Sequence, residues 1–309
     1  MFRRTRSVCV QWLILAAVGL VMGIGCRDTS GVSIEVAPQQ ASTDAEAPAG
    51  ADVPTNSSET AEKATADRLH QPFSQACTTE IHADSGVALP PVYTLTGKNT
   101  GLLNEEVQKV WDQIRFMDAA GKPQTYVVAL EVGIGERSLG TIEILMQPEW
   151  APNHVRNFVA LTQVGYYDGL RFDRVVRQRV DGESGSELLV VEAGAPTENA
   201  DPATSHLGYW VLPEFQPDLK HEAGFVGACL MPSEDNAETA ACRFYIALTP
   251  APAMDGNFTV FGKVTRGLEI VREISQQPVL SGDAGPDQGR FSTPIVIRRA
   301  VASPMPVVK

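Results

Sequence analysis

Two strand-like segments constrain this chain most. They are Tyr166–Val176 (YYDGLRFDRVV) and Met254–Val264 (MDGNFTVFGKV). Each combines a glycine-containing turn with aromatic and β-branched residues, a pattern typical of short strands beside turns. The first places Arg174 two residues after Phe172 in an otherwise apolar pattern. Burying an unpaired guanidinium is very unfavourable, so we expect Arg174 to face solvent or line a pocket.

The rest of the second half of the chain also predicts short strands, together with two helices. Residues 125–132 and 140–146 flank a polar, glycine-containing connection, which indicates a hairpin. Pro152 is placed to begin a helix and Gly165 to end it. A second helix is predicted from Leu268 to Ser275, with a proline shortly beyond its end. The fold class is therefore mainly β.

These segments resemble the cyclophilin family of peptidyl-prolyl cis-trans isomerases, whose signatures are GYYDG-x-x-FHRV and LDG-x-x-TVFGKV. Here Asp173 replaces the histidine and Met254 the leucine, while Arg174 keeps the arginine. The resemblance covers roughly residues 125–302. It implies a closed eight-stranded antiparallel barrel with two capping helices, which leaves no free edge strand.

The resemblance also implies a chemistry that needs neither a nucleophile nor a cofactor. Rotation about an amide has a barrier of about 18–20 kcal/mol because the bond is partly double. An enzyme lowers it by binding the twisted form of an X–Pro bond better than either planar form. That requires an apolar slot for the proline ring and a donor aimed at the prolyl nitrogen. Arg174 is the implied catalytic donor, because a guanidinium stays charged; the alternative is a surface arginine at a strand end.

Several implied substrate-binding positions depart from the family pattern. The family's phenylalanine, methionine and glutamine become Leu189, Val190 and Glu192; its alanine and asparagine become Cys229 and Leu230; its pocket-floor phenylalanine becomes Tyr245, preceded by Arg243 in place of glutamine; and its leucine and histidine become Met254 and Phe258. The apolar members have ordinary barrel core as their alternative role. A glutamate beside Arg174 either orients the guanidinium or withholds it from substrate. Two functions therefore stay open: an active isomerase, and a module that binds proline-containing segments without useful turnover.

The first residues have the pattern of an export signal. Basic residues at positions 3, 4 and 6 precede an apolar run from Val8 to Ile24, and Gly25-Cys26 follows. The pair resembles a bacterial lipobox, so residues 1–26 are interpreted as a signal peptide with Cys26 as the lipidated residue. An uncleaved membrane anchor and ordinary secretion are the alternatives. All three place the domain outside the cytoplasm, in the cell envelope or periplasm.

The segment between the signal and the barrel divides in two. Residues 27–75 are rich in alanine, serine, threonine, proline and acidic residues, which predicts a disordered linker acting as a tether. Residues 76–124 are interpreted as an extension containing one helix. Its spacing predicts that helix over 104–116, with Val107, Val110, Trp111 and Ile114 on one face that packs on the barrel or contacts a partner. Residues 303–309 are interpreted as a tail.

The cysteines bear on a possible disulfide, and the net charge bears on the classes of partner that we expect. Cys229 and Cys242 would flank a loop of the barrel and form a disulfide there, although Cys77 competes as a third thiol. Scattered histidines and the lack of a Cys-x-x-Cys spacing predict no metal site. A net charge of −12 argues against nucleic acid and anionic membrane surfaces. We expect a monomer that binds proline-containing polypeptides and meets the membrane only through its lipid anchor.

Overall fold

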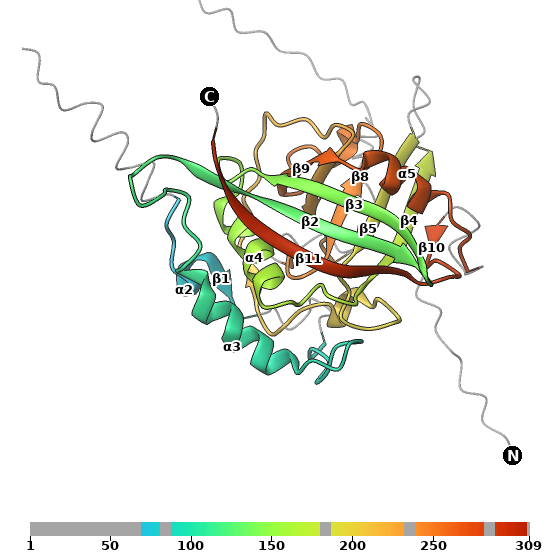
Figure 1. Cartoon of the computed structure of the whole chain (residues 1–309), viewed down its shortest axis with the longest axis horizontal. Helices are drawn as coiled ribbons and strands as arrows, with labels where there is room; N and C mark the ends of the chain where they lie inside the picture. The colour runs from blue at the N-terminus through green and yellow to red at the C-terminus, as the bar shows by residue number, and fades with distance from the viewer. Residues whose placement is uncertain (1–68, 81–87, 180–186, 232–238, 281–287, 308–309) are drawn as a thin grey trace, which may run out of the picture.

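The computed structural model describes residues 69–80, 88–179, 187–231, 239–280 and 288–307 (Figure 1). The predicted signal peptide, Cys26 and the linker up to residue 68 lie outside the described residues. Within the described residues, no helix is long and apolar enough to span a membrane.

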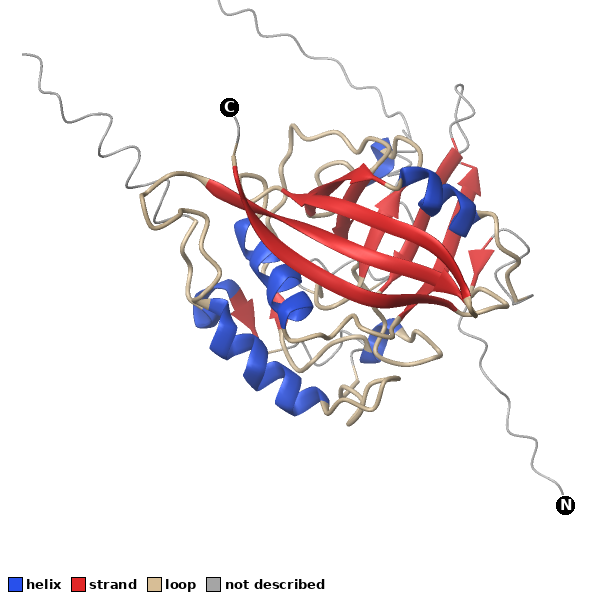
Figure 2. Ribbon diagram, viewed as in Figure 1, coloured by secondary structure: helices blue, strands red, loops and turns tan. Residues whose placement is uncertain are grey.

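Eight antiparallel strands form a closed barrel, as predicted (Figure 2). Around the barrel the order is β4-β11-β2-β3-β9-β7-β8-β5, and β5 pairs back onto β4. The strands are β2 (Gln124–Ile134), β3 (Arg137–Met146), β4 (Arg171–Arg179), β5 (Glu187–Ala193), β7 (Phe225–Ala228), β8 (Phe244–Ala247), β9 (Val260–Arg266) and β11 (Ile295–Pro306). A short strand, β10 (Gln288–Gly289), pairs with Val175 and Val176 of β4, beyond the two residues of β4 that pair with β11.

β11 is longer than the sequence suggested. It pairs with β2 along its whole length, from Ile295 opposite Ile134 to Pro306 opposite Gln124. Residues 303–306, predicted as part of a tail, are therefore the last part of a barrel strand. Two prolines in that stretch concealed it, because proline cannot donate a backbone hydrogen bond to a ladder.

Two helices lie at opposite ends of the barrel (Figure 1): α4 (Pro152–Gln163) and α5 (Leu268–Ser275). In α4 every residue from Pro152 to Thr162 is buried. The Glu214 carboxylate accepts hydrogen bonds from the backbone N–H groups of Asn153, at 3.0 Å, and His154, at 2.9 Å. An acidic cap of this kind stabilises the positive end of a helix.

α5 begins after a glycine that no other residue can replace without strain. Gly267 has a φ of 84°, and a Cβ placed on it would lie 2.6 Å from the backbone oxygen of Thr141 on β3. The left-handed conformation and this close approach fix where β9 ends and α5 turns back over the barrel.

The helix of the N-terminal extension packs on α4. The extension also reaches the barrel, where the Phe116 ring packs edge-on against Tyr126 of β2. Its helix, α3 (Thr100–Trp111), starts earlier than predicted because Asn99 caps it, accepting a hydrogen bond from the Leu102 N–H. It ends at Trp111, so Ile114 is buried beyond the helix instead of within it. The predicted apolar face is kept by Val107 and Trp111.

The folded part also begins before the predicted boundary at residue 75. The short helix α2 (Phe73–Ala76) leads into β1 (Cys77–Thr78), which pairs with β6 (Trp210–Val211). The Phe73 ring packs edge-on against Trp111, with ring centroids 5.2 Å apart. A segment predicted as linker therefore contributes to the core.

The buried apolar residues form two clusters. The larger one fills the barrel and the space around α4. The smaller one lies on the opposite face of β4, β5 and β8 and consists of Val176, Leu188, Val190, Tyr245, Ala247, Ala251 and Met254. We call this smaller group the outer cluster.

Candidate functional site

Strand register brings the predicted site residues into one row on the outer face of the barrel. Arg174 of β4 lies opposite Glu192 of β5, and Glu192 lies opposite Tyr245 of β8. Tyr245 in turn lies opposite Gly227 of β7. Cross-strand partners share a face of the sheet, so these four positions follow one another around the barrel.

A second row lies beside the first and is apolar. Val176, Val190 and Ala247 are cross-strand partners two residues along from Arg174, Glu192 and Tyr245. With Leu188, Ala251 and Met254 they complete the outer cluster, against which Cys229 and Phe258 also pack. Five of the predicted binding residues are thus brought together: Val190, Cys229, Tyr245, Met254 and Phe258.

Leu189 and Leu230, also predicted to bind substrate, lie elsewhere. Both are half-buried and pack against the interior cluster. Leu189 lies opposite Arg177, on the face of β5 turned away from Val190, because consecutive strand residues point to opposite faces. The same alternation predicts the residue that sequence reasoning missed, since Leu188 shares the face of Val190. The alternation also places Val176 on the same face of β4 as Arg174, because the two residues are two positions apart.

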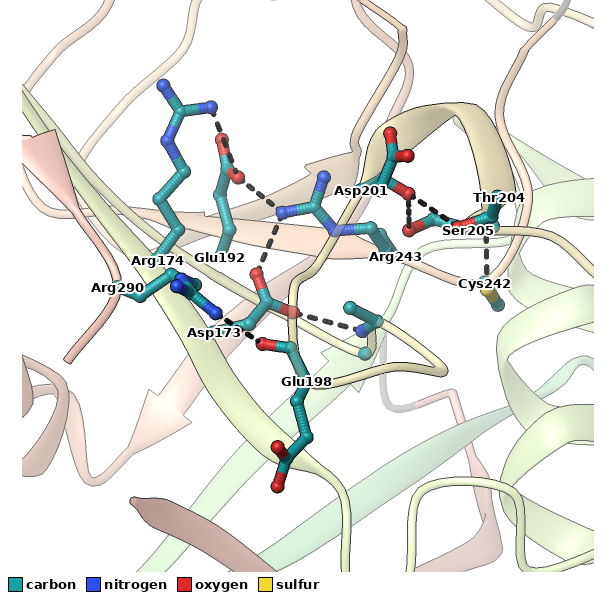
Figure 3. A network of polar contacts seen from close by, with 12 residues as sticks. Asp173, Arg174, Glu192, Glu198, Asp201, Thr204, Ser205, Cys242, Arg243 and Arg290 are labelled. Carbon is teal, nitrogen blue, oxygen red and sulfur yellow. Dashed lines mark hydrogen bonds and ion pairs between the residues drawn. The ribbon is translucent and has the colours of Figure 1, made fainter. Parts of the chain in front are cut away.

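The polar end of the site is a buried network of charges (Figure 3). One nitrogen of Arg243, Nη2, donates to Asp173 Oδ1 at 2.7 Å and to Glu192 Oε2 at 2.6 Å. Glu192 Oε2 is also 3.8 Å from Arg174 Nη1. The Ala195 N–H donates to the other oxygen of Asp173, at 2.9 Å. Two carboxylates thus meet two guanidiniums.

A strand irregularity allows two consecutive residues to join this network. The pairing of β4 with β5 shifts between Phe172 and Arg174, which leaves Asp173 as an extra residue. Such a bulge re-aims a side chain that would otherwise point to the opposite face. Asp173 can therefore reach Arg243 while Arg174 stays opposite Glu192.

Burial and charge act against each other on the ionisable groups of the network. Burial raises the pKa of Asp173, and the Arg243 guanidinium opposes that rise. Burial by itself would lower the pKa of Arg243, but the carboxylates of Asp173 and Glu192 outweigh it and raise that pKa well above its ordinary value. Arg243 is therefore a permanent cation.

The Tyr245 side chain of the outer cluster is held by a histidine that the sequence analysis did not select. His221 Nε2 is hydrogen-bonded to the Tyr245 hydroxyl at 2.9 Å, and His221 Nδ1 to Asp255 Oδ1 at 2.9 Å. The Tyr245 ring also lies over Gly227, where an added Cβ would overlap its hydroxyl end. Its ring orientation is thus held from both sides.

The predicted Cys229–Cys242 disulfide is absent, and the three described cysteines are free thiols. The Cys229 N–H donates to the Arg243 oxygen at 3.2 Å. Cys229 therefore lies opposite Arg243 and not opposite Cys242. Cys242 Sγ instead lies 3.2 Å from the Ser205 oxygen. Burial raises the pKa of Cys242 to about 12, so this thiol stays protonated and unreactive.

The sequence of this chain is similar to those of known proteins. Residues 129–302, more than half of it, match the family model described as cyclophilin type peptidyl-prolyl cis-trans isomerase/CLD. The chain is 32% identical over 167 residues to peptidyl-prolyl cis-trans isomerase ppi1 of Schizosaccharomyces pombe, an alignment covering 54% of this chain and 96% of that protein. It is 30% identical over 139 residues to peptidyl-prolyl cis-trans isomerase CYP18-2 of Arabidopsis thaliana, covering 45% and 77%.

Among solved structures, a cyclophilin type peptidyl-prolyl cis-trans isomerase of Cryptosporidium parvum aligns with a TM-score of 0.45 at 18% identity. That alignment covers 58% of this chain and 98% of the other. The family model, matched over the barrel and both signature segments, decides the assignment: this chain belongs to the cyclophilin-type peptidyl-prolyl cis-trans isomerase family.

Proposed function

We propose that the outer face of β4, β5 and β8 isomerises X–Pro bonds, with Arg174 as the donor and the outer cluster as the proline slot. The observation that carries this proposal is the strand register. Arg174 belongs to the cross-strand row of Glu192 and Tyr245, which lies directly beside the row of Val176, Val190 and Ala247. The row itself is buried, so a proline ring would rest against the half-buried Cys229 and Phe258 that pack on the outer cluster, with its nitrogen turned toward Arg174.

The division of labour follows from what an X–Pro bond requires. The ring needs a dry, shaped surface, which the half-buried Phe258 supplies above the buried Val190 and Met254. The nitrogen gains a lone pair only as the amide twists, so a donor aimed at it stabilises the transition state more than either planar form. Arg174 needs no change of protonation to act, because a guanidinium stays charged at any working pH.

A second function is favoured by one specific contact. Glu192 stands where the family has glutamine, and its Oε2 is 3.8 Å from Arg174 Nη1. A carboxylate that drew the guanidinium away from substrate would leave a module that binds proline-containing segments without useful turnover. The contact is an ion pair that is longer than a hydrogen bond between these two atoms, so the assay below decides between the two functions.

We further propose that the clients are polypeptides outside the cytoplasm and that a lipid on Cys26 tethers the protein in the cell envelope. The support is the basic-then-apolar start of the chain, which ends in Gly-Cys. Several acyl chains on one cysteine would anchor the protein firmly. Intact-mass analysis of membrane-extracted protein should find an acylated cysteine at the N-terminus; a chain that keeps residues 1–25 would end this idea.

The decisive experiment measures exchange between the cis and trans forms of a short Ala-Pro peptide by NMR, with wild type and Arg174→Ala. A charged hydrogen bond contributes about 1.5–3 kcal/mol, so the variant should lose about one to two orders of magnitude in kcat/KM. Peptide affinity and the free energy of unfolding should change little, because the contact strengthens only as the bond twists. Wild type that binds the peptide without accelerating exchange would establish the binding module instead.

A further inference from the structure

Three departures from the family pattern lie in contact with one another. Asp173 replaces a histidine, Glu192 a glutamine and Arg243 a second glutamine. In the fold the Arg243 guanidinium bridges the other two through a single nitrogen (Figure 3). All three side chains are buried. Replacing neutral side chains by charged ones at buried positions is tolerable only when the charges compensate one another.

The contact that matters for catalysis is on Glu192. Its Oε2 atom faces two cations, Arg243 Nη2 at 2.6 Å and Arg174 Nη1 at 3.8 Å. A charge-assisted hydrogen bond at the shorter distance is much the stronger of the two. Arg243 is also nearly inaccessible, with 5% of its side chain exposed against 19% for Arg174. Water therefore screens the Arg243 contact less than the Arg174 contact.

We propose that Arg243 is a positioning residue, which holds the Glu192 carboxylate and so prevents it from drawing Arg174 out of the proline slot. This inference rests on the proposed function of Arg174. Without Arg243, Glu192 would keep Arg174 as its nearest described cation, and pairing would shorten the 3.8 Å contact. Asp173 anchors Arg243 from the other side and does not contact Arg174 through its described hydrogen bonds.

Two double variants with the same net charge separate this role from simple loss of a buried ion pair. Arg243→Gln/Asp173→Asn removes the cation and leaves Glu192 charged beside Arg174. Arg243→Gln/Glu192→Gln removes the same cation and leaves Asp173 as the only carboxylate of the network. Each removes one carboxylate and one guanidinium, so any general cost of dismantling the network falls on both.

We expect the variant that keeps Glu192 to lose about tenfold in kcat/KM, which is about 1.4 kcal/mol. The variant that keeps Asp173 should lose less activity than the variant that keeps Glu192, because no carboxylate is left opposite Arg174 to draw it away. Arg243→Lys, which preserves the charge, should retain more activity than Arg243→Gln. Equal activities in the two double variants, or the reverse order, would overturn the proposal.

A readout independent of turnover comes from the Arg174 side chain itself. Its Nε–H resonance in an NMR spectrum should shift, and its hydrogen exchange should slow, in Arg243→Gln/Asp173→Asn relative to wild type. In Arg243→Gln/Glu192→Gln the hydrogen exchange of that group should not slow, because no carboxylate is left opposite Arg174. If wild type proved inactive, the proposed function would fail while this comparison still decided the positioning role. An Arg174 resonance that is the same in both double variants would refute it.

Discussion

The two faces of β4, β5 and β8 obey different rules. On the interior face, Val175, Val191 and Ile246 are cross-strand partners with no exposed surface. On the outer face, the matching row is Arg174, Glu192 and Tyr245. Interior positions require apolar side chains of matching volume and shape. Outer positions are constrained in addition by charge and by the close approach of Tyr245 to Gly227.

The interior face should show the largest stability loss on truncation. Phe244→Ala on β8 removes a ring that packs against Phe158 and Tyr167, and should lower the free energy of unfolding by about 3–5 kcal/mol. Leu188→Ala in the outer cluster, which is much smaller, should cost only about 2 kcal/mol but weaken peptide binding. Urea denaturation of both variants makes the test; equal losses would remove the distinction between the faces.

A smaller effect should appear where Gly227 meets Tyr245. Gly227→Ala places a methyl group against the Tyr245 ring and should destabilise by about 1–3 kcal/mol, as overpacking does. In a Tyr245→Ala background the ring is gone, so the same substitution should have little effect. A double-mutant cycle measures the coupling. Simple additivity would show that the backbone at Gly227, and not the ring, sets the cost.

The smallest expected effect is a dependence of the free energy of unfolding on pH. Burial lowers the pKa of His221 below 6.5, so the folded protein favours the neutral imidazole. Its stabilisation is therefore complete above pH 6.5 and is lost as pH falls below that value, with a slope of at most about 1.4 kcal/mol per pH unit. His221→Gln should flatten this part of the profile of unfolding free energy against pH.

His206 supplies the matched control for that measurement. Burial also lowers its pKa, but it lies outside the outer cluster, bonded to the Ala88 oxygen at 2.8 Å. His206→Gln should flatten the same window without changing peptide binding, whereas His221→Gln should alter both. A profile unchanged by His221→Gln would mean that this residue titrates alike in the folded and unfolded chain.

The sequence pattern was enough to predict the barrel and its two helices, but not the end of β11 or the segment around Phe73 that packs beside the barrel. The two signature segments and the two helix starts depend on local turn and capping residues, and the structure places them as expected. The end of β11 and the segment around Phe73 were missed because their stability comes from distant partners, β2 and Trp111. Long-range packing of that kind leaves little trace in local composition.

The site residues also separate into those that local motifs predict and those that depend on distant parts of the chain. The positions of Arg174, Val190 and Tyr245 followed from the motifs, and strict strand alternation would have corrected Leu189 to Leu188. The bridging of Asp173 and Glu192 by Arg243 could not be predicted, because it depends on a bulge in β4 and on the loop before β8. Neither feature has a pattern in a single sequence.

The place of β11 in the barrel has a consequence for how the protein is made. β11 pairs with β2 along its length and with β4 at its start, so the ring of strands cannot close before residues 295–306 have been synthesised. Until then β2 and β4 expose unpaired edges, which are open to pairing with other chains. A protein proposed to act on the folding of others would thus itself depend, until β11 arrives, on protection of these two strand edges.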